Sequence, residues 1–426
     1  MENVESTIGK LCEKYMLGRV IKPPLAVTGG LLHKMYRVAT DKGEYAVKIL
    51  NPNIMKRDNV LNNMIHSEQI SNELKNKINL IGAKEFDGKR VIMLDEYYFM
   101  VFEWLEGKSV FGDDITENHC EQIGLALGKI HKANIHIEGL KPESQARKLI
   151  DWDYLLNEAE KQKADYAGII RDNLSKLKKW DRQSAGSFKE VSKRQVISHR
   201  DLDPKNVMWK DNKPFIIDWE AAGYVNPFQE LIEVINYWCV NPVGKYDNNK
   251  LSKLMKGYVQ SMNIAGVNWE AILNCSYDGM SGWLEYNLKR ALGIEGAGEN
   301  DKEEGKTQLI QTIFELNKCS ERQEELRELL YSYGQNCPEE LILNIEKLHT
   351  TALGITRIKK NLSLAEDDVV NWCKSKILSN NADITKKGKN WYINVDNCII
   401  TVNGYSYTII TAHREKKQAA SGQKGE

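Results

Sequence analysis

The chain has 426 residues, more than one ordinary hydrophobic core accommodates, so we expect two or three domains. Lysine plus arginine and aspartate plus glutamate both number 59. This zero net charge gives no reason to expect a nucleic-acid partner or an anionic membrane surface. No apolar run approaches the roughly 20 residues of a membrane helix, and the polar N-terminus lacks a signal-peptide core. With eight scattered cysteines, these features predict a cytoplasmic protein with reduced thiols.

The first 107 residues predict a small, strand-rich lobe. Residues 2–17 have the pattern of an amphipathic helix. Residues 25–50 alternate apolar and polar positions, and Gly-Gly and Asp-Lys-Gly supply turns, which is typical of antiparallel strands. Residues 56–78 have helical spacing, and residues 89–107 predict two more strands that end at a glycine.

After Gly107 the pattern becomes mainly helical, first at residues 118–135 and then over much of 150–182. A stretch rich in glycine and acidic residues, 293–306, predicts an exposed loop. We therefore predict a lobe boundary at residue 107 and a helical second lobe over 108–335. A cleft between two lobes is a common place for a small ligand to bind.

The remaining residues predict a separate small α+β domain over 336–415. Helical patterns are followed by alternating strands, and Asn403-Gly404 between two of them is a strong hairpin signal. The final residues, 416–426, are polar and predict a disordered tail.

The stretch "SHRDLDPKNVMWKDNKPFIID" places oxygen-bearing side chains at a spacing that suits phosphoryl transfer. Asp201 and Asn206 share a loop, and a hairpin turning at Asp211-Asn212 would return Asp218 to the level of Asn206. Phosphoryl transfer needs ligands for a hard divalent metal and a carboxylate that orients the attacking hydroxyl. The pattern favours one carboxylate facing the substrate, with an amide and a second carboxylate facing the metal.

These residues resemble the aminoglycoside phosphotransferase and choline kinase superfamily of small-molecule kinases. The resemblance covers roughly residues 20 to 330 and includes "TGGLLHKMYRV", "VFEWLEG", "NPFQELIEVINYW" and "WLEYNLKRALG". It implies an α+β, bilobal, protein-kinase-like fold, with a small antiparallel-sheet lobe and a larger helical lobe. It also implies Mg²⁺ as cofactor and ATP or GTP as phosphate donor.

The resemblance assigns roles to four residues of this stretch, residues 198–218, which we call the catalytic stretch. Asp201 would be the catalytic base, Asn206 and Asp218 would bind Mg²⁺, and His199 would give structural support to the loop. The alternative for Asp201 is an ordinary turn residue, since Asp203-Pro204 nearby is also turn chemistry.

The first lobe would bind the nucleotide. Gly29 and Gly30 would let the backbone approach the phosphates, and Lys48 in "YAVKIL" would contact them. A helix glutamate must hold this lysine, and Glu68 fits better than Glu73, although the sequence does not decide between them. A surface lysine on an edge strand is the alternative for Lys48.

The hinge backbone around Glu103 and Leu105 would pair with the purine, and because main-chain groups do so, ATP and GTP are not distinguished. Glu220 could assist a second metal or the substrate, or form a structural ion pair. His33 stands where the family often has asparagine. Several further side chains could line a pocket for a cationic acceptor, or equally be solvated charges and core aromatics: Asp153, Asp278, Glu285, Trp152, Tyr154, Trp283 and Tyr286.

The predicted function is therefore phosphorylation of a hydroxyl on a small polar or cationic molecule. By analogy the acceptor is an aminoglycoside or another antibiotic, and choline, homoserine or a sugar are the alternatives. A protein kinase is disfavoured because "DWE" replaces DFG and no APE follows. A non-catalytic, nucleotide-binding pseudokinase or partner-binding protein is the alternative of another class.

The last 85 or so residues lie outside the kinase pattern and resemble a small bacterial domain of unknown function. They contain no catalytic cluster that we can assign. A module that binds a protein partner or covers a lobe is one interpretation, and a structural appendage is the other. The expected partners of the whole chain are a nucleoside triphosphate and a small-molecule acceptor.

Overall fold

The structure is a computed structural model, and it describes residues 4–27, 33–296, 298–336, 341–342, 344–379 and 381–414. Gly29, Gly30 and the tail predicted at 416–426 lie outside these residues. The chain forms two compact units, Met1–Met262 with Glu270–Gln323, and Asn263–Trp269 with Glu324–Glu426. The lobe boundary at 107 and the domain boundaries at 335 and 415 stay predictions.

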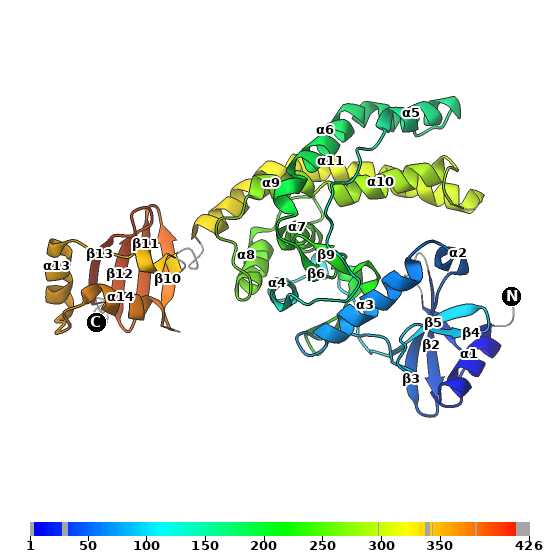
Figure 1. The fold of residues 1–426 in the computed structure, drawn as a ribbon, viewed down its shortest axis with the longest axis horizontal. Helices are drawn as coiled ribbons and strands as arrows, with labels where there is room; N and C mark the ends of the chain where they lie inside the picture. The colour runs from blue at the N-terminus through cyan, green and yellow to red at the C-terminus, as the bar shows by residue number, and fades with distance from the viewer. Residues whose placement is uncertain are drawn as a thin grey trace, which may run out of the picture. The chain divides into compact units, whose positions relative to one another are not determined.

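The first lobe is built on a five-stranded antiparallel sheet with the order β1-β2-β3-β5-β4. Figure 1 labels β2, β3, β4 and β5 of this sheet. Its strands are β1 Leu25–Val27, β2 Lys34–Thr40, β3 Gly43–Ile49, β4 Ile92–Leu94 and β5 Tyr97–Glu103. Its helices are α1 Val4–Lys14, α2 Pro52–Met55 and α3 Val60–Leu74. The strands and helices predicted for this lobe are therefore present.

Strand alternation places Lys48 on the face of the sheet that α3 covers. Val47 packs with α1 in one hydrophobic cluster, whereas Met100 packs with Met64 of α3 in another. Successive residues of a strand point to opposite faces, and Lys48 is the register partner of Met100. Lys48 therefore lies on the opposite face from Val47.

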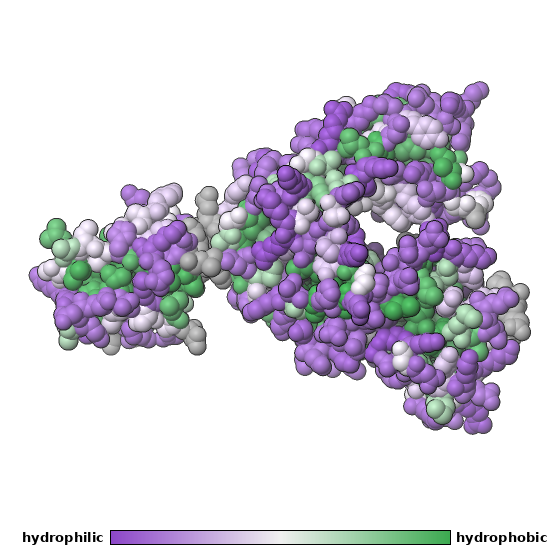
Figure 2. All heavy atoms as spheres, viewed as in Figure 1, coloured by the Kyte–Doolittle hydropathy of each residue, from purple (hydrophilic) through white to green (hydrophobic). Residues whose placement is uncertain are grey.

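The second lobe is mainly helical and carries two short hairpin-like sheets, β6 with β9 and β7 with β8. Its first elements are η1 Gly112–Asp114, α4 Glu117–Ala133, α5 Trp152–Lys161, α6 Ala167–Val191, β6 Val196–Ser198, η2 Pro204–Asn206, β7 Val207–Lys210, β8 Lys213–Ile216, η3 Trp219–Ala221 and β9 Gly223–Val225. Helices follow: α7 Pro227–Trp238, α8 Asn248–Val259, α9 Trp269–Cys275, α10 Asp278–Ala291 and α11 Glu299–Asn336. The bilobal α+β fold predicted from the sequence is confirmed. Hydrophilic side chains cover most of the face seen in Figure 2.

The exposed loop predicted at 293–306 is wrong from Glu299 onward, where α11 begins. Its acidic residues stabilise the start of this helix, because negative charge is favourable at a helix N-terminus. Arg290 of α10 also forms ion pairs with Asp301 and Glu304. The acidic composition therefore reflects pairing with α10 and not a solvated loop.

The second unit contains a four-stranded antiparallel sheet, β10-β11-β12-β13, that packs against two helices. Its elements are η4 Ile345–Lys347, α13 Ala352–Leu362, α14 Val369–Ile377, β10 Asp383–Lys387, β11 Asn390–Val395, β12 Cys398–Asn403 and β13 Ile409–Arg414. The small α+β domain predicted here is confirmed.

The hairpin predicted at Asn403-Gly404 exists, but its turn is longer than the sequence signal implied. Residues 404–408 separate β12 from β13. The Asn403 side chain accepts hydrogen bonds from the backbone of Tyr405 and Ser406, both at 3.0 Å. The tight two-residue turn lies instead at Asp396-Asn397, where both residues have positive φ.

Candidate active site

The catalytic stretch forms a loop between β6 and β7, followed by the predicted hairpin. Asp211 and Asn212 make its turn, with φ of 52° and 56°. The hairpin returns the chain to the loop, because the Ile217 backbone N–H donates to the Asn206 carbonyl at 2.9 Å. His199 lies between the two segments: its Nε2–H donates to the Ile217 carbonyl at 3.0 Å, and its Nδ1 accepts from the Asp201 backbone at 3.3 Å.

Asp201 and Asn206 face each other directly. The Asn206 amide nitrogen donates to the Asp201 backbone carbonyl at 2.8 Å and to its Oδ2 at 2.9 Å. This leaves the Asn206 amide oxygen available to a hard cation. Burial raises the pKa of Asp201, although Lys205, 3.5 Å away, and His199 act in the opposite direction. The carboxylate is 34% exposed, so a substrate can reach it.

A buried network fixes the loop from behind. Arg200 adopts φ 67°, and its backbone N–H donates to Glu230 of α7 at 2.6 Å. The other oxygen of Glu230 lies 2.7 Å from His131 Nε2, and His131 Nδ1 lies 2.9 Å from the Tyr258 hydroxyl. Burial opposes the charge of Glu230, but the bond to His131 and its positive field lower the pKa of the carboxyl. Trp238 also donates to the Leu202 carbonyl at 2.8 Å.

Lys48 reaches across to the second carboxylate. Its Nζ lies 3.2 Å from Asp218 Oδ1 and also contacts Glu220 Oε1. Burial would lower the pKa of Lys48, but Asp218 and Glu220 outweigh it and raise the pKa. Burial would likewise raise the pKa of Glu220, but His33 and Lys48 lower it to about 2. The structure thus brings Lys48, Asp201, Asn206 and Asp218 into one connected group.

Neither glutamate of α3 pairs with Lys48 among the residues that the structure describes. The Glu68 side chain is buried and accepts from the Ala83 backbone N–H at 2.7 Å and from Ser71 Oγ at 3.3 Å. Burial raises the pKa of Glu68, and the bond from Ala83 and the charges of Arg90 and Lys48 only partly offset this, so Lys48 acts on Glu68 through charge although the two form no ion pair. Glu73 is exposed on the same helix.

The two hinge residues predicted to meet the purine differ in their backbone pairing: Glu103 pairs with Tyr45 in the sheet. Leu105 makes no hydrogen bond to any other residue within the described part of the chain. The Glu103 side chain points elsewhere and pairs with Lys84. A Cβ on Gly107 would lie 2.9 Å from the Trp209 carbonyl oxygen, so glycine here allows the hinge to approach β7 closely.

The acidic residues suggested for an acceptor pocket each have a basic partner. The pairs are Asp153 with Lys178, Asp278 with Arg147, and Glu285 with Lys289. The suggested aromatic residues differ in exposure: Trp152 is in the core, Tyr154 and Trp283 are exposed, and Trp283 packs against Tyr286.

Two glutamates of α7, Glu230 and Glu233, were not singled out from the sequence. Glu233 is half-buried and forms neither a hydrogen bond nor an ion pair with the described residues. Burial and the neighbouring Glu230 charge raise the pKa of Glu233 to about 8, and Asp201 contributes in the same direction. Two carboxylates three residues apart in the otherwise apolar "NPFQELIEVINYW" were the available signal.

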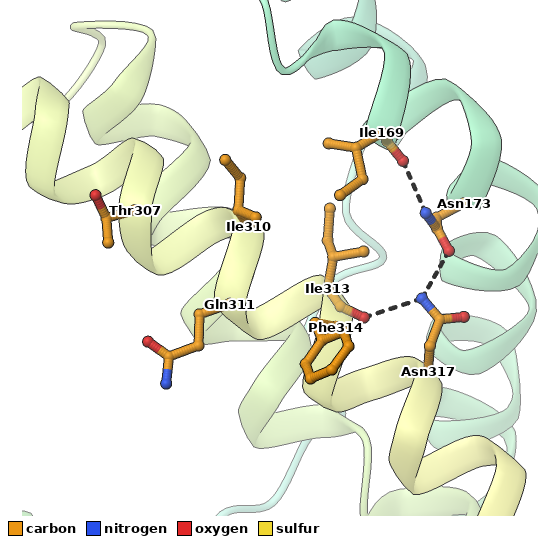
Figure 3. Close-up of a pocket in the computed structure, with 8 residues that line it drawn as sticks. All are labelled: Ile169, Asn173, Thr307, Ile310, Gln311, Ile313, Phe314 and Asn317. Atoms are coloured by element: carbon orange, nitrogen blue, oxygen red, sulfur yellow. Dashed lines mark hydrogen bonds between the residues drawn. The ribbon is translucent and has the colours of Figure 1, made fainter.

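A separate groove of about 460 Å³ lies between α6 and α11 and includes none of the predicted site residues. Figure 3 shows its lining: Ile169, Asn173, Thr307, Ile310, Gln311, Ile313, Phe314 and Asn317. The two asparagines bond to each other at 2.8 Å and to backbone carbonyls of their own helices. They are therefore already satisfied.

None of the helices that the structure describes has the length and apolar character required to cross a membrane. No curated protein sequence matches the chain significantly. Among solved structures, spectinomycin phosphotransferase in complex with ADP and spectinomycin aligns with a TM-score of 0.58 and 13% identity, over 75% of this chain and 100% of that chain. Its AMP-bound complex gives 0.53 and 12% identity, over 72% and 94%. At these identities the likeness shows the fold.

Two family matches cover most of the chain. Residues 342–413 match a protein family of unknown function, DUF3781, which confirms the resemblance expected for the C-terminal domain. Residues 25–254, more than half of the chain, match the phosphotransferase enzyme family, as the catalytic stretch predicted. The chain belongs to the phosphotransferase enzyme family.

Proposed function

We propose that this protein transfers the γ-phosphoryl group of ATP or GTP, with Mg²⁺, to a hydroxyl group of a small polar or cationic molecule. The observation that carries the proposal is that two side-chain pairs, Lys48 with Asp218 and Asn206 with Asp201, are brought together by the backbone bond from Ile217 to Asn206. A base, two oxygen ligands and a phosphate-binding cation are what this chemistry requires.

Asn206 and Asp218 would hold the magnesium ion, which neutralises charge on the phosphates when bound. The free amide oxygen of Asn206 and the partly exposed carboxylate of Asp218 suit a hard cation. Asp201 accepts the proton of the acceptor hydroxyl while the oxygen of that hydroxyl forms a bond to the γ-phosphorus. The bond from that phosphorus to the oxygen that bridges the β- and γ-phosphates breaks, and the nucleoside diphosphate, ADP or GDP, leaves while Lys48 offsets its charge.

For the acceptor we propose an aminoglycoside or another antibiotic, with choline, homoserine and sugars as alternatives. Spectinomycin phosphotransferase, which has the same fold, was solved with spectinomycin. Glu233, which forms no hydrogen bond or ion pair with the described residues and whose raised pKa favours the neutral acid near pH 7, supports an acceptor that offers hydrogen-bonding groups. The described cysteines are free thiols, which supports a cytoplasmic location.

The test is a transfer assay with γ-labelled ATP, Mg²⁺ and a panel of spectinomycin, gentamicin, choline, homoserine and glucose. Asp201→Asn should lower turnover by about 10²-fold or more, the range for a general base, while calorimetry shows nucleotide binding retained. Asp203→Asn, in the same loop, is the matched control, since asparagine can keep the cap on the Lys205 backbone.

Near-normal turnover of Asp201→Asn would refute the role given to this carboxylate. If wild-type protein binds Mg²⁺ and ATP but labels no acceptor and hydrolyses no ATP, the non-catalytic alternative is favoured. A protein partner for residues 342–413 stays a prediction; assaying the chain without residues 340–426 shows whether this part is needed for transfer.

A further inference from the structure

The partner of Lys48 is the feature of the site that departs from the expected pattern. We propose that Glu220, and not a glutamate of α3, is the counter-ion that positions Lys48, and that His33 braces Glu220. This inference rests on the proposed function, in which Lys48 contacts the nucleotide phosphates. Glu220 is thus a positioning residue, and three observations support this assignment.

First, among the described residues Lys48 contacts Asp218 and Glu220, and the contact with Glu220 is the less exposed to solvent. The Lys48 side chain is 11% exposed, Glu220 is 22% exposed and Asp218 is 44% exposed. Solvent screens an ion pair less as burial increases. A buried amine also needs a permanent partner, because an unpaired buried charge is costly. Glu220 supplies one without using a metal ligand.

Second, Glu68 is already engaged and cannot move to Lys48 without loss. Its Oε2 accepts from the buried Ala83 backbone N–H at 2.7 Å, and Ser71 Oγ adds a bond at 3.3 Å. Turning the carboxylate toward Lys48 would leave the Ala83 N–H unpaired. Glu68 therefore holds the segment after α3, which itself pairs with β8 through Ile81 and Ile216.

Third, the buried His33 ring lies at ion-pair distance from the other oxygen of Glu220. Its Nδ1 accepts from the Asn51 backbone N–H at 2.9 Å, so its Nε2 carries the proton. Nε2 lies 3.4 Å from Glu220 Oε2, and the side chain is 3% exposed. The two Glu220 oxygens are thus divided between Lys48 and His33. Asp218 is then free to turn toward the metal while Glu220 keeps Lys48 in place.

The first test uses no nucleotide. In thermal unfolding of the full chain, Lys48→Met and Glu220→Gln should each lower Tm, and the double variant should lose clearly less than the sum. Glu68→Gln should also lower Tm, but its coupling to Lys48→Met should be clearly weaker than that of Glu220→Gln, because Lys48 acts on Glu68 through charge alone and not through a contact. Glu96→Gln, in the exposed turn between β4 and β5, is the matched control and should change nothing. Additive losses for Glu220 with Lys48, or coupling of Glu68 instead, would overturn the proposal.

The second test measures binding of ATP with Mg²⁺ by calorimetry. Glu220→Gln should weaken Kd about tenfold or more, with no further loss in the Lys48→Met background, and His33→Ala should give part of the same loss. An effect of Glu220→Gln that persists without Lys48 would mark a merely structural role and overturn the inference. If wild-type protein does not bind the nucleotide, the proposed function fails. If it binds and Glu220→Gln behaves as Glu96→Gln, this inference alone fails.

Discussion

Replacing Glu230 by alanine should destabilise the protein far more than replacing it by glutamine. Glu230 is 1% exposed, and its two oxygens serve different partners, the Arg200 backbone N–H and His131. Alanine removes both acceptors at once. The comparison therefore tests whether the network behind the catalytic loop is held by hydrogen bonds or by packing alone.

The magnitude follows from what each variant leaves unpaired. Alanine leaves the Arg200 N–H and the His131 ring buried without an acceptor, and breaking a buried charge pair costs about 3–5 kcal/mol. Glutamine can keep its oxygen on Arg200. Its amide N–H can donate to His131 Nε2 once that nitrogen gives up its proton, while the Nδ1–H of the neutral ring donates to the Tyr258 hydroxyl. We expect a loss of about 1 kcal/mol for this neutral arrangement.

The assay is chemical denaturation of the full chain, with activity measured in parallel. The second unit has its own hydrophobic core, so its transition should not move and provides an internal reference. Alanine and glutamine variants within about 1 kcal/mol of each other would refute the reasoning. Although burial opposes the charge, His131 lowers the pKa of Glu230. Its stabilisation is therefore present above the ordinary carboxyl pKa and is lost as pH falls through the lowered pKa.

Three further predictions concern the metal ligand, the base and the hinge. Asp218→Ala should abolish the Mg²⁺-dependent part of nucleotide binding, measured by calorimetry with Mg²⁺ and again with Mg²⁺ removed by EDTA. A wild-type protein whose affinity is the same under both conditions, or a variant whose affinity equals that of the wild type, contradicts this. Burial raises the pKa of Asp201 and Lys205 opposes this rise, so kcat/KM should fall as pH drops through the raised pKa. Lys205→Met should move the acid side of the pH profile of kcat/KM to higher pH, and a profile that does not move counts against Asp201 as the base. Gly107→Ala should lower the free energy of unfolding by about 1–3 kcal/mol and weaken nucleotide binding, because the new Cβ meets the Trp209 carbonyl. A variant with the unfolding free energy and the nucleotide Kd of the wild type would contradict this, because the backbone could then shift without cost.

The sequence by itself determined features that depend on neighbours along the chain. Strand alternation placed Lys48 and Val47 on opposite faces, and the Asp211-Asn212 turn followed from residues that tolerate positive φ. The spacing of Asp201, Asn206 and the strand after the turn was enough to expect them side by side. Turn chemistry and a period of two are local properties, so no knowledge of the packing was required.

Only the tertiary structure decided which groups compensate one another. Lys48 pairs with Glu220, 172 positions away, although a glutamate of α3 was expected. Asp301 and Glu304, predicted to lie in an exposed loop, are in α11 and pair with Arg290. Glu230 is charged in the core because His131 and the Arg200 backbone meet it there. Ion pairs between distant segments depend on how helices and sheets pack, and residue order does not specify that packing.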